Sequence, residues 1–271
     1  MSYSEEHFLF SSDPNEGAYN VSSDGSRFSV SFNPALRFNQ NATRIRLELL
    51  ECELYYTSPN ILNNVNNRLD LSYEDIHGIV RIYNIVIPEG LYTLENLNDE
   101  IIRLLGTQGG QTNPPLISFT PNASNSRVIM TLIGNSRVDF SKPYSVGILF
   151  GFLPIAYVPY GVVSNDRKSI FEATNPARLN NINFFVLNCN ILLEGLNFNG
   201  ISRQALGRIL INNEPGGQII STPQHPYSID ITNLKYSSYN NLTFWITSDT
   251  DKPISTSEPY SFRLRITTEL E

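Results

Sequence analysis

The sequence contains little cysteine, with only Cys52 and Cys189 among its 271 residues. Two cysteines so far apart form neither the disulfide framework of a small secreted domain nor the ligand spacing of a zinc site. We therefore expect both to be free thiols that fill the core as small apolar side chains.

Charged residues are also scarce, at 17% of the chain, and acidic residues outnumber basic ones, which gives a net charge of −7. No lysine or arginine precedes Arg27, whereas several acidic residues do. A protein that holds nucleic acid by its phosphates needs a basic face. Nucleic acid is therefore not an expected partner.

Long apolar runs are missing as well. No segment approaches the length that spans a membrane, and the first residues lack the charged and then apolar pattern of a signal peptide. We expect no membrane span and a chain that is made without entering the secretory pathway.

Motifs for catalysis and for cofactor binding are not found. The sequence has three histidines, at His7, His77 and His225. None of them has the spacing of a metal site, and neither a nucleophile elbow nor a phosphate-binding loop is present. Glu95, Asp99 and Glu100 lie early in a predicted helix, where acidic residues are favoured by the helix dipole rather than needed for acid–base chemistry. We expect no metal, no cofactor and no enzymatic activity.

What the sequence does contain is a series of short strands. Phe28, Val30 and Phe32 alternate with polar residues, which is typical of a half-buried strand. Later strands are expected at 183–194, 207–212, 229–234, 242–248 and 260–268. Turn residues fill the gaps between them, and many strands at such spacing predict a sandwich or jelly roll.

One helix interrupts the strands. The strand that contains Ile82, Ile85 and Ile87 stops at Pro88, and apolar residues then recur at helical spacing. These are Leu94, Leu97, Ile101, Leu104 and Leu105. The spacing predicts a helix over 93–105, capped by Thr93 and ended by Gly106. A β-hairpin is expected next, over 116–133, with its turn at Pro121-Asn122-Ala123-Ser124-Asn125-Ser126.

These elements predict an all-β fold, a single jelly-roll sandwich with an inserted helix plus β-hairpin. We expect the jelly-roll domain to span 27–271 and the α/β insertion to span about 91–159. The strands of Cys52 and Cys189 are expected in one sheet, but not as neighbours. Leu94, Leu97, Ile101 and Leu104 are expected to pack against the hairpin.

The first residues form a different kind of segment. Residues 1–26 are mostly polar and have no sustained period, which predicts an extended N-terminal arm outside the fold. The arm carries one apolar cluster, Phe8, Leu9 and Phe10. An isolated aromatic cluster on an acidic arm suggests a docking segment that a partner protein covers.

Several motifs resemble those of one family. Pro88-Glu89-Gly90-Leu91-Tyr92-Thr93-Leu94-Glu95 leads into the helix, and Leu149-Phe150-Gly151-Phe152 follows the hairpin. In this order, they resemble the minor capsid, or penton, proteins of virophages and Polinton-type viruses. The similarity continues through Asn188-Cys189-Asn190 and closes with the strand at 260–266. The chain departs from the family at Asp249-Thr250-Asp251-Lys252, where many relatives have an Asp followed by Gly.

The resemblance implies a structural protein of the virion. Such pentons form homopentamers at the fivefold vertices of an icosahedral capsid, among trimers of a double-jelly-roll major capsid protein. It therefore implies two partners, other copies of this chain and the major capsid protein, and a place at the capsid vertex.

The alternatives to a capsid role are a lectin-like module and a hydrolase. A carbohydrate-binding, lectin-like jelly roll would gather aromatic and amide side chains on its loops, for instance around Tyr157 and Tyr160, and would make a host receptor or glycan a further partner. A hydrolase on a β scaffold is disfavoured, because no constellation of His, Asp and Ser residues or of paired carboxylates is found.

Overall fold

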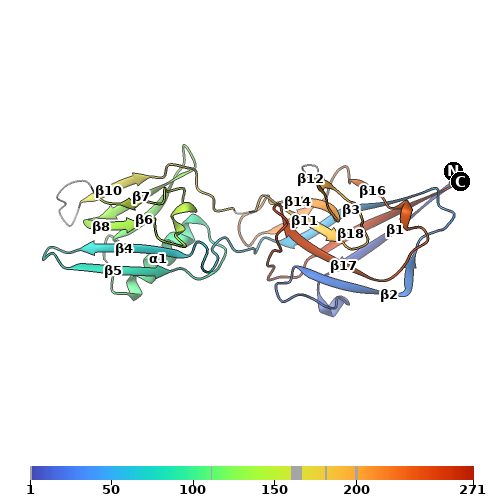
Figure 1. Cartoon of the computed structure of the whole chain (residues 1–271), viewed down its shortest axis with the longest axis horizontal. Coiled ribbons are helices and arrows are strands. Elements are labelled where there is room, and N and C mark those ends of the chain that lie inside the picture. Colours follow the sequence, from blue (N-terminus) through green and yellow to red (C-terminus); the bar gives the residue numbers. More distant parts are fainter. Residues whose placement is uncertain (1, 111, 160–166, 181, 199–200) are drawn as a thin grey trace. The chain divides into compact units, whose positions relative to one another are not determined.

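The structure is a computed structural model that describes residues 2–110, 112–159, 167–180, 182–198 and 201–271. The chain forms two compact units. The jelly-roll unit consists of Met1–Ser58 and Ile182–Glu271, and the insertion unit consists of Pro59–Asn181. Figure 1 shows that each unit is built mainly from strands, and that the chain leaves and re-enters the jelly-roll unit around the insertion.

The jelly-roll unit contains two large antiparallel sheets and a two-stranded ribbon of β12 (Asn197–Phe198) and β13 (Ile201–Ser202). The first sheet has the order β1 (Ser2–Ser11), β18 (Ser261–Leu270), β3 (Arg44–Tyr55), and then β15 (Gln218–Ser221) and β16 (Ser228–Asp230), which both pair with β3. The second sheet has the order β14 (Ala205–Leu210), β11 (Phe184–Cys189), β17 (Ser238–Ser248) and β2 (Arg27–Arg37). Because β15 and β16 share one position, each sheet has four strand positions, as in a jelly roll. The predicted fold class is confirmed.

The first strand of this fold is the segment that was expected to be an arm. β1 pairs with β18 along its whole length, from Ser2 opposite Leu270 to Ser11 opposite Ser261. The prediction of an extended arm over 1–26 is therefore wrong for these residues. Strand β1 lies at a sheet edge and its first half is exposed on both faces, so little of the alternating pattern of a buried strand is present in its sequence.

The two cysteines are free and buried, as predicted. Cys52 lies on β3 and Cys189 on β11, so they belong to different sheets, and their placement in one sheet was wrong. Burial raises the pKa of the Cys189 thiol to about 12, and burial raises that of Cys52 further, helped by the charges of Glu53 and Glu51. Both thiols therefore stay protonated near neutral pH.

This burial predicts the reactivity of both thiols. In the native protein at pH 8, we expect neither Cys52 nor Cys189 to react with a maleimide, because the thiolate is the nucleophile and both side chains are inaccessible. After denaturation without reductant, both should be labelled fully. Mass spectrometry counts the labels, and rapid native labelling of either cysteine would contradict its assigned place in the core.

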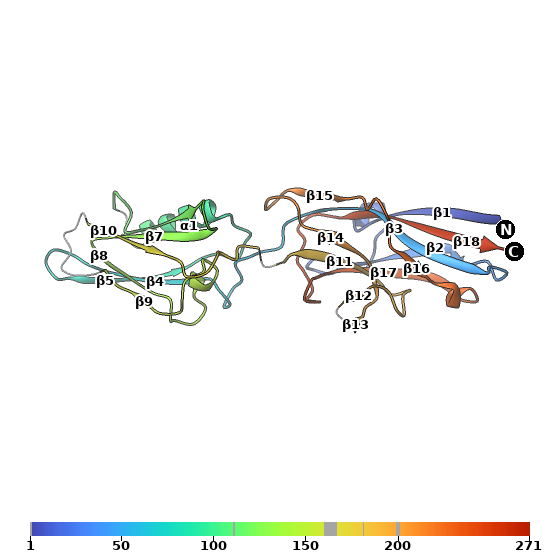
Figure 2. The ribbon, with the colours of Figure 1, turned by 90° about the horizontal axis from the view of Figure 1, so that it is seen from above.

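In its described residues, the insertion unit also has two antiparallel sheets, with one α-helix and a short 3-10 helix at Val146–Ile148. The four-stranded sheet has the order β5 (Val80–Val86), β4 (Arg68–Glu74), β8 (Asn135–Asp139) and β9 (Ala156–Tyr157). The three-stranded sheet has the order β10 (Lys168–Glu172), β7 (Arg127–Ile133) and β6 (Ile117–Asn122). Helix α1 (Leu94–Thr107) contacts β6 and β5. Figure 2 shows this unit from a second direction.

The insertion is longer than the predicted 91–159. It begins before the hairpin of β4 and β5 and ends after β10. That hairpin belongs to the insertion because β4 pairs with β8, within the unit, over five residue pairs from Asp70–Asp139 to Glu74–Asn135.

The asparagine-rich loop that precedes β4 is ordered by its own side chains. Asn60 and Asn67 are buried there, and Asn60 Nδ2 donates a hydrogen bond to the Tyr92 carbonyl at 2.7 Å.

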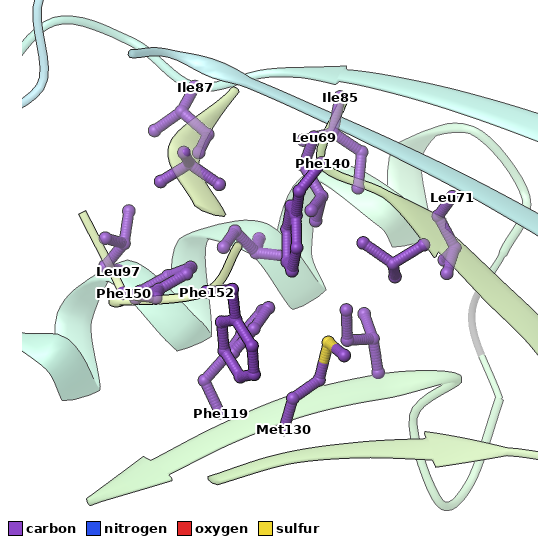
Figure 3. Close-up of a cluster of buried hydrophobic side chains, with 14 of the residues drawn as sticks. Leu69, Leu71, Ile85, Ile87, Leu97, Phe119, Met130, Phe140, Phe150 and Phe152 are labelled. Atoms are coloured by element: carbon purple, nitrogen blue, oxygen red, sulfur yellow. The ribbon is translucent and has the colours of Figure 1, made fainter. Parts of the chain in front are cut away.

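Helix α1 supplies much of the core of the insertion unit. The Thr93 hydroxyl accepts a hydrogen bond from Asn96 N at 3.1 Å, as expected for an N-cap, and the helix runs one residue past the predicted end at Gly106. Leu97 and Ile101 are fully buried in the hydrophobic cluster of this unit, whereas Leu94 and Leu104 are partly buried against it. Figure 3 shows Leu97 beside Phe150, with Phe119 and Met130 on the strands below the helix.

Candidate assembly surfaces

The predicted docking residues lie on opposite faces of β1. Phe10 is buried with 7% of its surface exposed, and Phe8 is half-buried, so both point toward the inside of the sandwich. Leu9, between them, points outward and is 70% exposed. Because side chains alternate between the two faces of a strand, the three residues cannot form one docking cluster.

The two phenylalanines belong to the aromatic core between the sheets. The ring centroid of Phe10 lies 4.8 Å from that of Phe244 on β17 and 5.5 Å from that of Phe262 on β18. Phe32 on β2 contacts both Phe8 and Phe10 edge-on, at 6.4 Å and 6.2 Å. These residues therefore join β1 to both sheets, and only Leu9 remains available to a partner.

The outer face of the first jelly-roll sheet is strongly charged. Arg265 on β18 contacts Glu48 on β3 at 2.5 Å, and Arg46 contacts Glu269 at 2.8 Å. The hydrogen bond with Glu48 raises the pKa of Arg265. These pairs are partly exposed, so each contributes little to stability. They pair four charged side chains of this face within the chain.

The outer face of the second sheet carries two contacts between an arginine and an aromatic ring. The Arg27 guanidinium lies 5.6 Å from the ring centre of Trp245, and that of Arg208 lies 5.3 Å from Phe184. Between them, the buried Asn188 Nδ2 donates to the Val186 carbonyl at 3.1 Å. Leu210, at the end of β14, faces the same side as Arg208 and is 54% exposed.

The outer face of the four-stranded sheet in the insertion unit exposes a group of aliphatic residues. On β5, Tyr83 and Ile85 point inward, whereas Val80, Ile82 and Val86 are exposed. The β4–β5 turn adds two more exposed aliphatic residues, Ile76 and Ile79. We call these five exposed residues the β5 patch. The expected strand around Ile82, Ile85 and Ile87 is present, but Ile82 and Ile85 lie on opposite faces of β5.

A shallow groove of about 460 Å³ runs beside the β5 patch, across β4, β8 and β9. Asp70 on β4 lies opposite Asp139 on β8. Burial raises the pKa of Asp70, with a further contribution from the charge of Asp139, and a hydrogen bond from Ser141 lowers that of Asp139. Lys142 contacts Asp139 at 3.7 Å, so the floor of the groove carries both signs of charge.

The structure also bears on the residues considered for metal binding, acid–base chemistry and sugar binding. Among the described residues, no group of three or more His, Cys, Asp or Glu side chains is arranged to hold a metal ion. Glu100, on α1, is paired with Arg103 at 2.7 Å.

The tyrosines predicted for sugar binding are not both described. The ring centroid of Tyr157 lies 5.6 Å from that of Phe140 and 5.3 Å from that of Phe152, both edge-on, so its ring is not offered to a sugar. Tyr160 lies outside the described residues. Within the described ranges, every helix is too short or too polar to cross a membrane.

Comparison with solved structures identifies the fold. The crystal structure of the mavirus penton protein matches with a TM-score of 0.51 and 10% identity, over 99% of this chain and 99% of that chain. A chain in the structure of the Sputnik virophage matches with a TM-score of 0.43 and 10% identity, over 97% of each chain. No family model and no curated protein matches the sequence. The predicted resemblance in fold to penton proteins is confirmed.

Proposed function

We propose that this chain is a structural virion protein, a penton that forms homopentamers at the fivefold vertices of an icosahedral capsid. There it contacts the double-jelly-roll major capsid protein. The observation that carries the proposal is the match to the mavirus penton protein along the whole of both chains, insertion included. The chain acts through shape and burial, with no catalytic step and no cofactor.

The chemistry of the surfaces supports this role. A closed ring uses a heterologous interface, in which one surface of each subunit contacts a different surface of the next. The chain exposes aliphatic residues in the insertion unit, and it has a low charge fraction of 17%. Apolar residues are favoured and charges are depleted at the cores of such interfaces.

A lectin-like role is the second candidate, either alone or as an additional role of an exposed vertex. The groove on the four-stranded sheet is the observation that favours it. Asp70, Ser72 and Asn84 line this groove and could hydrogen-bond sugar hydroxyls. A glycan array with the full chain tests this role, and specific binding that is lost in Asp70→Ala would support it.

Light scattering on the purified chain tests the penton proposal. One subunit has a mass of 30.6 kDa, and we expect a species of about five times this mass. A mass that stays at one subunit at all concentrations would reject the homopentamer and leave the lectin-like role.

A further inference from the structure

We infer that the β5 patch, together with the neighbouring face of the four-stranded sheet, is the surface through which one copy of this chain contacts the next in the ring. The inference rests on the proposed function and assigns a surface to it. The occupant is a second copy of this chain, which presents a different surface of its own.

The first support is the exposure of the β5 patch. Ile82 is 70% exposed, and the other four members of the patch are also more than half exposed. They lie on the edge strand of the sheet and on the turn that leads into it. On β5, Val80, Ile82 and Val86 face outward, with Asn84 between Ile82 and Val86. Exposed branched aliphatic residues at a sheet edge favour association.

The second support is the charge of the same face. The chain carries a net charge of −7, so two copies repel each other unless they meet where charge is balanced. Three basic and three acidic side chains lie beside the β5 patch, five of them on β4 and β8 and the sixth at Lys142. They are Arg68, Arg137, Lys142, Asp70, Glu74 and Asp139. Arg137 and Glu74 approach to 3.8 Å, and this area is locally neutral.

The same face argues for a protein rather than a glycan as the occupant. The residues that line the groove include Ile82, Ala156 and Val158, but no aromatic side chain that a sugar could stack upon. Aliphatic walls around a neutral polar floor suit the side chains of a protein surface, with its mixture of apolar and polar groups.

The test uses two matched substitutions in the full chain, Ile82→Asp and Ile170→Asp. Both residues are isoleucines on strands of the insertion unit, with 70% and 68% of their surface exposed, but Ile170 lies on β10 in the other sheet. Because a carboxylate in an apolar contact loses its hydration, we expect Ile82→Asp to weaken each subunit contact by roughly 30-fold or more. Light scattering over a concentration series should show the loss of the pentamer, while Ile170→Asp keeps it.

The outcomes separate this inference from the proposed function. If the unsubstituted chain forms pentamers and Ile82→Asp forms them equally well, the inference is overturned and the penton proposal stands. If Ile170→Asp loses the pentamer to the same extent as Ile82→Asp, the effect is not specific to the β5 patch and the inference is also overturned. If the unsubstituted chain never associates, both fail.

A second variant, Ile82→Cys, measures the accessibility of the β5 patch and introduces no charge. Because Cys52 and Cys189 are buried, Ile82→Cys has a single reactive thiol in the native state. We expect maleimide to react at least tenfold more slowly with the concentrated, assembled protein than with the diluted protein. Equal rates would show that the β5 patch stays open in the assembly and would overturn the inference.

Discussion

Phe10→Ala is expected to destabilise the jelly-roll unit by about 3–5 kcal/mol, the usual cost of removing a buried phenylalanine side chain. The ring of Phe10 lies between the two sheets and contacts Phe244 and Phe262. Its loss would leave a cavity and would remove one of the two aromatic side chains that join β1 to the second sheet. Denaturant unfolding followed by tryptophan fluorescence reports on this unit, because the only tryptophan, Trp245, lies on β17.

Leu9→Ala is the matched control for this experiment. Leu9 is the next residue on the same strand, but its side chain points to the solvent. An exposed side chain of this kind should change the free energy of unfolding by no more than about 0.5 kcal/mol. If Phe10→Ala unfolds like Leu9→Ala, β1 contributes nothing to the fold and the first residues are an arm after all.

Leu97→Asp is expected to destabilise the insertion unit by more than about 4 kcal/mol, because it places a carboxylate in a fully apolar cluster. Circular dichroism should lose the signal of helix α1 at low denaturant. Trp245 lies in the jelly-roll unit, which has a core of its own, so its fluorescence transition should stay close to that of the unsubstituted chain.

The control for this substitution places the same group on the solvent side of the same helix. Asn96 is exposed in the first turn of α1, where a carboxylate is favoured by the helix dipole, so Asn96→Asp should leave the circular dichroism transition unchanged or slightly raised. A Leu97→Asp variant that unfolds like Asn96→Asp would mean that the buried face of the helix is wrongly assigned.

The helix was the most predictable element of the fold, for physical reasons. The period of Leu97, Ile101 and Leu104, a capping threonine and a preceding proline all indicated the same segment, and α1 begins where they place it. Local signals suffice here because hydrogen bonds within a helix join residues that are close in sequence.

The sequence could not identify β1, because its neighbour lies at the other end of the chain. Ser2 pairs with Leu270, and no local pattern records such a contact. The apolar cluster at Phe8 and Phe10 predicted that another surface buries these rings. That surface is the opposite sheet of the same chain. The limits of the insertion were missed for a similar reason, since the pairing of β4 with β8 decides them.

The β5 patch was overlooked although one signal for it was present. Ile82 and Ile85 are three residues apart, so a strand must place them on opposite faces. A strand that is apolar on both faces is typical of one that is covered on both sides. That signal indicates a covering partner, but it does not say whether the cover is the same chain or another copy.

The proposed function requires that the chain closes into a ring of five. Electron cryo-microscopy of the purified chain is the sharpest test, because averaged end-on views reveal the rotational symmetry without any assumption about mass. We expect rings with fivefold symmetry built from identical subunits. Single subunits at every concentration, or a closed assembly of any other symmetry, would contradict it.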